Sequence, residues 1–307
     1  MRSTILLFHR VNPQRDRLWD PMPPELFEKV IRYVASNYEV LPLEKVCLQN
    51  ESGSKSSMAI TFDDGYKDYI DYALPILESY HLPSSMFVVP QCVISGMPTW
   101  TYIMDYLFFN TTKLELPFFD YGRECEDFAI YEWRNSEERI QYAAKFKQYL
   151  KRVPNRKRVE IIEHFSCGFN DVALPENLMM TWDDLRRLKG KGIEIGSHSL
   201  SHPPLATIED EDELHKEIKL SGEIIEEELG FFPTTISYPV GSYNEKVKSI
   251  SHQSGYKIGL AVDQKIYDPG KQDIFQVPRI ELYNESFLRT KLKISGIEGT
   301  LRSIFKL

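Results

Sequence analysis

The sequence has few of the features that hold together small secreted domains or anchor a chain in a membrane. Its 307 residues contain four cysteines, at positions 47, 92, 125 and 167, and no two of them form a CxxC pair. This spacing favours free thiols in a reducing compartment over disulfides or a cysteine zinc site. No stretch approaches the roughly 20 apolar residues of a transmembrane helix, so we expect no transmembrane segment.

An excess of positive charge is also absent. There are 37 Lys and Arg against 45 Asp and Glu, which gives a net charge of −8 at pH 7. Because nucleic-acid binding needs a basic face, we expect no nucleic-acid partner. One local exception is the basic stretch 145–158, "KFKQYLKRVPNRKR". It could face an anionic lipid or a sugar phosphate, but we interpret it as a solvated helix face.

The N-terminus lacks a signal-peptide pattern. Its apolar run covers only residues 5–8 and is followed at once by His9 and Arg10. This run is too short for a signal-peptide core, and no small-residue cleavage site follows it. We therefore expect a cytoplasmic protein with at most peripheral membrane contact. Nothing in the sequence indicates an oligomeric state.

Short apolar runs alternate with amphipathic stretches along most of the chain. Strands are expected at 4–8, 39–43, 58–62, 85–89, 193–196, 234–238, 257–262 and 275–280, and helices at 24–36, 66–80, 182–191, 210–229 and 244–254. This alternation is typical of βα units and predicts an α/β fold with a parallel sheet or barrel. The segment 97–180 breaks this pattern and is too long for a plain loop, so we expect a helical insertion there.

Polar residues follow several of the expected strands. His9 follows "ILLF", Asp63 and Asp64 follow "MAITF", His198 follows "IEIGS", and Arg279 follows "IFQVP". In a parallel barrel the carboxyl ends of the strands share one mouth, where working residues lie. Because polar residues follow several separate strands, we predict that they meet in one site at this mouth.

The stretch "TFDDGY" places two carboxylates side by side at the end of a buried strand. Adjacent like charges repel, which favours protonation of one of them unless a cation lies nearby. Neighbouring strand residues point to opposite faces, so Asp63 and Asp64 can share a site only if the strand ends there. Gly65 permits such a turn. The alternative is that Asp64 caps the helix that follows.

The stretch "HSLSHPPL" carries His198 and His202 four residues apart. One helical turn would put both imidazoles on the same side, and the following prolines would end that turn. Asp64, His198 and His202 would supply the three protein ligands that a catalytic zinc commonly takes. A cation held there would also keep Asp63 deprotonated as a base. We expect one divalent ion, Zn²⁺ first, with Co²⁺, Ni²⁺ and Fe²⁺ as alternatives.

The motifs "TFDDGY" (61–66), "HSLSHP" (198–203) and "YPVG" (238–241) resemble the first three motifs of polysaccharide deacetylases of the NodB-homology, carbohydrate esterase 4 type. The resemblance covers roughly residues 4–90 and 180–296. It implies a distorted (β/α) barrel of seven or eight mostly parallel strands, in a single NodB-homology domain over residues 1–307 with the insertion at about 97–180. It also implies a metal-dependent hydrolase that removes N-acetyl groups from a sugar in a polysaccharide or a glycan precursor.

By the same resemblance, Asp63 would be the general base, the metal would be held by Asp64, His198 and His202, and the Val240 N–H would stabilise the oxyanion. Two positions depart from the family pattern. Ser237 stands where the third motif usually has an arginine, and Arg279 could replace it from another strand. "RIELYNESF" lacks the usual late histidine. His9 in "LLFHRV" resembles the N-terminal histidine of circularly permuted members and would be the acid.

Other functions stay open. The same motifs could cleave another linear or cyclic amide, or belong to a catalytically inactive member that binds an acetylated sugar or glycan. The complete set of Asp64, His198 and His202 argues for an enzyme. A purely structural metal would need a fourth protein ligand, for which the sequence offers no candidate.

Overall fold

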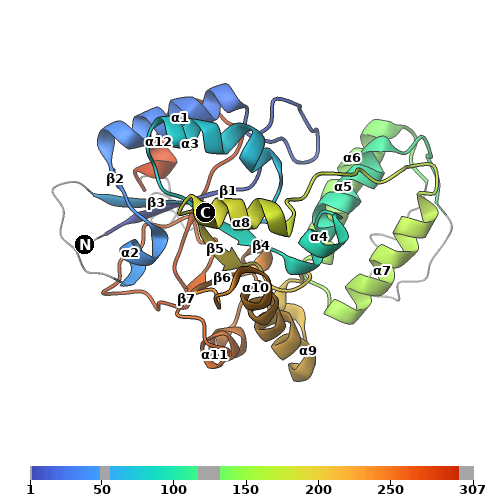
Figure 1. The fold of residues 1–307 in the computed structure, drawn as a ribbon. Helices are drawn as coiled ribbons and strands as arrows, with labels where there is room; N and C mark the ends of the chain where they lie inside the picture. Colours follow the sequence, from blue (N-terminus) through green and yellow to red (C-terminus); the bar gives the residue numbers. More distant parts are fainter. Residues whose placement is uncertain (1, 49–55, 117–131, 297–307) are drawn as a thin grey trace.

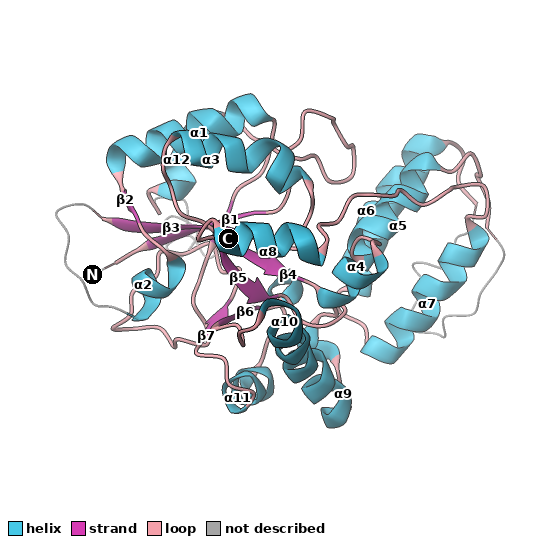
Figure 2. Cartoon of the chain, viewed as in Figure 1, coloured by secondary structure: helices cyan, strands magenta, loops and turns pink. Residues whose placement is uncertain are grey.

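A computed structural model describes residues 2–48, 56–116 and 132–296 of the chain. Its centre is a parallel sheet with helices packed around it (Figure 2). The strands are β1 (Thr4–Phe8), β2 (Glu39–Val40), β3 (Ser57–Phe62), β4 (Ser85–Val88), β5 (Glu194–Ser197), β6 (Thr235–Ser237), β7 (Ile258–Leu260) and β8 (Ile280–Glu281). The main path runs β7-β6-β5-β4-β3-β1-β8, and β2 pairs with β3 beside it.

Every pairing between these strands is parallel, so their carboxyl ends lie at one edge. The sheet curves into an incomplete barrel whose path ends at β7 and β8. A single bridge between Leu260 and Val277 continues the pairing beyond β7. The predicted α/β fold with a distorted barrel of mostly parallel strands is confirmed.

The prediction of a strand over residues 275–280 is wrong in its first half. Asp273 accepts a hydrogen bond from the Phe275 backbone N–H at 2.9 Å, and the Gln276 N–H donates to the Asp273 carbonyl at 2.9 Å. These bonds close a local turn, because an aspartate side chain competes with the strand ladder for backbone donors. Regular pairing begins only at Ile280, opposite Leu6 of β1.

Most helices that cover the sheet follow the expected amphipathic stretches: α1 (Pro24–Asn37), α3 (Leu74–Ser79), α8 (Trp182–Gly190), α9 (Glu211–His215), α10 (Ser221–Leu229) and α11 (Glu245–Gln253). Two more, α2 (Leu43–Leu48) and α12 (Phe287–Ile294), form where no helix was expected. The stretch expected as a helix from residue 66 becomes helical only at Tyr69, where a π-helical turn leads into α3. Between sheet and helices lies the main apolar core, in which Phe8 stacks on Phe62 with ring centroids 5.3 Å apart.

Between β4 and α8 the chain forms α4 (Pro90–Ser95), α5 (Trp100–Asn110), α6 (Ser136–Leu150) and α7 (Asn155–Gly168). The last three lie together to one side of the sheet (Figure 1) and enclose an apolar cluster of their own around Phe108, Phe146 and Phe165. The division of the chain into one domain with an insertion at about 97–180 stays a prediction.

Two further sequence expectations concern cysteines and membrane spans. Cys47, Cys92 and Cys167 have free thiols, while Cys125 lies outside the described residues. None of the helices formed by the described parts of the chain has the length and apolar character needed to cross a membrane.

Candidate active site

The two carboxylates of "TFDDGY" are brought to one side by a tight turn at the end of β3. The Asp63 N–H still donates to the Phe8 carbonyl at 3.0 Å, as a strand residue would. Asp64 and Gly65 then take φ values of 76° and 84°, in the left-handed region. Such a conformation is strained for aspartate and concentrates at functional sites. This turn reverses the chain, so the Asp64 side chain does not point to the face opposite Asp63, as it would in a continuing strand.

The alternative role of Asp64 as a helix cap is not what the structure shows. The helical turn after this segment begins at Tyr69, five residues later. Its flanking residue is Asp68, which makes no capping hydrogen bond with its side chain. The Asp64 side chain faces His198 and His202 instead.

His198 and His202 converge, although the expected helical turn between them is wrong. Ser199 and His202 have φ values of 59° and 67°, and no helix spans them. The His202 N–H donates to Ser199 Oγ at 3.1 Å, and Ser201 donates from its N–H and its hydroxyl to the Glu217 carboxylate at 3.0 and 2.5 Å. This loop brings the two imidazole centroids to 4.9 Å. No pattern in the sequence pointed to this role of Glu217.

Asp64 and the two histidines form a buried cluster with no more than 4% of any side chain exposed. Asp64 Oδ1 lies 3.4 Å from His198 Nε2 and 3.3 Å from His202 Nε2. Both distances exceed the roughly 2.7–2.9 Å of a charge-assisted hydrogen bond. Asp64 Oδ1 is accordingly a buried oxygen without a hydrogen-bond partner in the part of the chain described.

The tautomer of His198 strengthens this arrangement. Its Nδ1 lies 2.8 Å from the Ser237 carbonyl, which can only accept, so in the neutral ring Nδ1 is the donor. Nε2 then carries a lone pair that points toward Asp64. A lone pair beside a carboxylate is unfavourable unless a proton or a metal ion lies between them; burial lowers the pKa of His198, but Asp63 and Asp64 raise it by more. A hydrogen bond from the other ring nitrogen to a carbonyl, as His198 Nδ1 makes, is typical of metal-binding histidines. Asp64, His198 and His202 therefore fit a divalent metal ion.

Asp63 is held by Arg279, which reaches it from the approach to β8. Arg279 is fully buried and donates from Nη1 to Asp63 Oδ1 at 2.8 Å and from Nη2 to Oδ2 at 2.7 Å. Ser237 Oγ donates to the same Oδ2 at 2.9 Å. Burial raises the pKa of Asp63, but Arg279 and His198 lower it by more, so the pKa lies below its ordinary value. The carboxylate is therefore ionised at neutral pH.

His9 lies at the end of β1, beside Glu281 of the neighbouring β8. Its Nδ1 is 3.5 Å from Glu281 Oε1, and its ring meets Trp19 edge-on at 5.2 Å. The imidazole is 18% exposed, so one side of it is open. Glu281 was missed in the sequence, although a signal existed: it lies two residues after Arg279, and alternate strand residues share a face.

Val240 occupies a tight turn after β6. The Gly241 N–H donates to the Tyr238 carbonyl at 3.0 Å, and the Ser242 N–H to the Pro239 carbonyl at 2.9 Å. Val240 itself has φ 50°, which is rare for a β-branched residue. Its assignment as an oxyanion donor stays a prediction.

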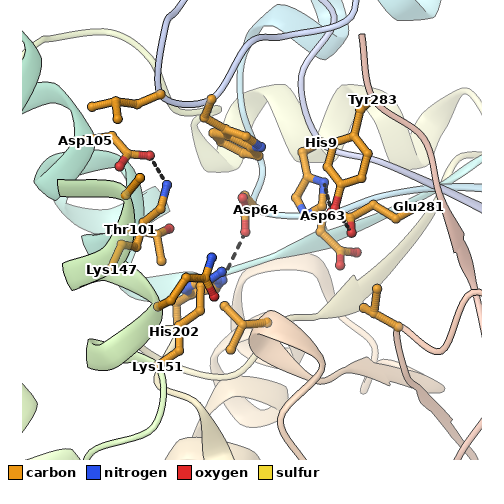
Figure 3. Close-up of a pocket in the computed structure, with 16 residues that line it drawn as sticks. His9, Asp63, Asp64, Thr101, Asp105, Lys147, Lys151, His202, Glu281 and Tyr283 are labelled. Carbon is orange, nitrogen blue, oxygen red and sulfur yellow. Dashed lines mark hydrogen bonds and ion pairs between the residues drawn. The ribbon is translucent and has the colours of Figure 1, made fainter. Parts of the chain in front are cut away.

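A cavity of about 310 Å³ opens above these groups (Figure 3). Of the seven residues singled out in the sequence, five line it: His9, Asp63, Asp64, His202 and Val240. His198 and Arg279 lie behind them, 1% and 0% exposed. The opposite wall comes from α5 and α6 and includes Thr101, Asp105, Lys147 and Lys151. Two lysines of the basic stretch thus face the cavity, unlike the solvated face expected for that stretch.

The sequence matches the family model described as polysaccharide deacetylase over residues 50–106 and 128–259, which is more than half of the chain. The chain belongs to the polysaccharide deacetylase family. Among curated relatives of this deacetylase family, YxkH of Bacillus subtilis (strain 168) is 19% identical over 263 residues, which are 84% of this chain. The chain spans 64% of the length of that relative.

Solved structures of deacetylases have the same fold. The Streptococcus pyogenes deacetylase PplD, in complex with acetate, superposes with a TM-score of 0.64 at 17% identity, covering 96% of this chain and 98% of that one. IcaB from Ammonifex degensii gives 0.62 at 15% identity, covering 95% and 97%. A de-N-acetylase from Aggregatibacter actinomycetemcomitans gives 0.61 at 17% identity, covering 95% and 100%. At these low sequence identities, the structural similarity shows only that the fold is shared.

Proposed function

We propose that this polysaccharide deacetylase family member is a metal-dependent hydrolase that removes an N-acetyl group from a sugar in a polysaccharide or a glycan precursor. The observation that supports this most is the meeting, in one cavity, of an ionised Asp63 with the Asp64, His198 and His202 cluster. Family membership and the name of the de-N-acetylase with the same fold also support it.

Asp64, His198 and His202 would hold the ion. Their one carboxylate oxygen and two imidazole nitrogens are the donors that Zn²⁺ takes in catalytic sites, and Co²⁺, Ni²⁺ or Fe²⁺ would also fit. When bound, such an ion would act as a Lewis acid toward the acetyl carbonyl and would make water more acidic.

Asp63 would take the proton of the attacking water. Arg279 and Ser237 engage its two oxygens and fix the plane of the carboxylate, which keeps the base oriented. The Val240 N–H would donate to the developing oxyanion, and loss of one such donor typically costs about 10²–10³ in rate. His9 would give a proton from Nε2 to the leaving nitrogen, because its Nδ1 faces Glu281.

The proposal is tested by acetate release from N-acetylglucosamine oligomers, with the protein loaded with zinc and, in parallel, stripped by a chelator. We expect release by the loaded protein and none by the stripped one. Ring opening of a cyclic imide, or ammonia from a linear amide, with no acetate from any sugar would instead indicate another amidohydrolase. Tight oligomer binding without any product would indicate a glycan-binding member.

Replacing His9 with alanine should lower kcat by about 10²–10⁴, the usual contribution of a general acid, with little change in metal content. The physical reason is that His9 lies outside the Asp64, His198 and His202 cluster, so its loss removes a proton donor and no ligand. kcat and bound zinc are measured together. A wild-type kcat in this variant would remove His9 from the mechanism.

A further inference from the structure

The wall of the cavity that comes from α6 carries positive charge. Lys147 and Lys151 are four residues apart, at the end of α6 and directly after it, and both line the cavity. Figure 3 shows them on the side away from His9, Glu281 and Tyr283. The chain as a whole has a net charge of −8. A pair of ammonium groups in this cavity therefore calls for a specific reason.

The carboxylates around the cavity supply that reason for Lys147, which pairs with Asp105, but not for Lys151, because each of them already has another partner. Asp63 is bound by Arg279, Asp64 faces two histidines, Asp105 is bound by Lys147, and Glu281 lies beside His9. Among the described residues that line the cavity, Lys151 is the charged side chain to which no ion pair within 4 Å is assigned.

The environment of Lys151 is unfavourable for a lone ammonium. The residue is partly buried, and burial together with the nearby Lys147 lowers the pKa of its side chain by more than the surrounding carboxylates, Glu281, Asp105 and Asp64, raise it. A partly desolvated charge without a counter-ion costs free energy, and an anion placed beside it would recover that cost. A lysine kept in this state at the wall of a candidate active site fits a role in binding an anion that arrives with the substrate.

We propose that Lys151 binds a phosphate group carried by the substrate, so that this site takes acetylated amino sugars that are phosphorylated on the same or the adjacent unit. This inference rests on the deacetylase function proposed above. An ammonium is a compact point charge with three donors, which suits the oxygens of a phosphate. A flat carboxylate is matched better by the planar fork of arginine. Because Lys151 and His202 line the same cavity, the phosphate and the acetyl group would lie within one or two sugar units.

The test compares two substrates, an N-acetylglucosamine oligomer and the same oligomer with a terminal phosphate, on the zinc-loaded protein. The measured quantity is the ratio of kcat/KM for the phosphorylated oligomer to that for the neutral one. Lys151→Met should lower this ratio about tenfold or more, as loss of one charge-assisted hydrogen bond does. Lys151→Arg should keep most of it.

Lys145→Met is the matched control, because Lys145 lies on the same helix, is exposed and does not line the cavity. It removes the same charge and should leave the ratio unchanged. An equal fall in Lys145→Met and Lys151→Met would mean a general field effect. An unchanged ratio in Lys151→Met would mean that the phosphate binds elsewhere, for example at the metal. Either result overturns the proposal.

A second measurement separates this inference from the proposed function. Calorimetry on zinc-loaded Asp63→Asn protein gives the affinities of both oligomers without turnover. We expect tighter binding of the phosphorylated oligomer, and a loss of about tenfold when Lys151→Met is added. If wild-type protein releases no acetate from either oligomer, the deacetylase proposal fails, and these affinities still decide the role of Lys151. Equal affinities for the two oligomers would overturn it.

Discussion

Replacing Asp63 with asparagine is expected to lower kcat by about 10²–10⁴ while the protein keeps its metal ion. The single oxygen of the amide, placed where Oδ2 lies, can still accept from Arg279 Nη2 and Ser237 Oγ, but the amide NH2 then faces Arg279 Nη1, and the amide cannot take a proton from water. The proposed ligands Asp64, His198 and His202 are untouched by the change. Acetate release and bound zinc are measured on the same preparation.

The substitution also weakens a buried ion pair, because Arg279 then faces a neutral side chain with no exposure to water. Removing one partner of a buried pair can cost about 3–5 kcal/mol of stability. Asp68→Asn is the matched control: Asp68 is 6% exposed, accepts from Arg10 Nε at 2.7 Å and does not line the cavity. It should lose stability in the same way and keep its turnover. Substantial turnover in Asp63→Asn would contradict the assignment of the base.

The second large effect is expected for His202→Ala, which should lose the metal ion and, with it, turnover. His202 supplies one of the cluster's three donor atoms, so its removal leaves two. Removing a residue that hydrogen-bonds to a metal ligand typically lowers metal affinity about 10–100-fold. Removing a ligand itself should lower it further. His252→Ala is the control, because His252 is exposed on α11, away from the cluster. It should retain both metal and turnover.

The sequence allowed much of the site to be predicted because parallel strands end at one edge. His9, Asp63 and His198 each follow a strand, and the order β1 beside β3, with β4 and β5 next, brings those ends together. Arg279 could be nominated as the residue that follows an expected strand, but in the structure it precedes β8. Its contact with Asp63 depends on β8 lying beside β1, which is a property of the strand order in the whole sheet and not of any local pattern.

Prediction from local residue propensities was wrong where the backbone adopts conformations that these propensities disfavour. Asp64, Ser199, His202 and Val240 all have positive φ although none is glycine, and all lie at the site. Positive φ is uncommon for any residue other than glycine, and most unusual for a β-branched residue such as valine, so the spacing of the two histidines suggested a helical turn instead. Such strain persists only because the surrounding contacts over-determine it.

The cavity wall contributed by α6 could not be placed from sequence either. The pattern of the basic stretch shows charge on a helix but not which side of that helix meets the barrel, because docking is set by distant contacts. In the structure Phe146 and Leu150 pack into the cluster between α5, α6 and α7, and this orientation turns Lys147 and Lys151 toward the site. The sequence shows that this stretch is positively charged, but it does not show that Lys147 and Lys151 point toward the site.

The most direct test of metal-dependent hydrolysis at this site is the metal content of the purified protein, by elemental analysis, beside His202→Ala and His252→Ala. We expect about one tightly held ion per chain in the wild type and in His252→Ala, and loss of that ion in His202→Ala. No specific ion in the wild type, even after zinc loading, would contradict a metal-dependent hydrolase and favour an inactive glycan-binding protein.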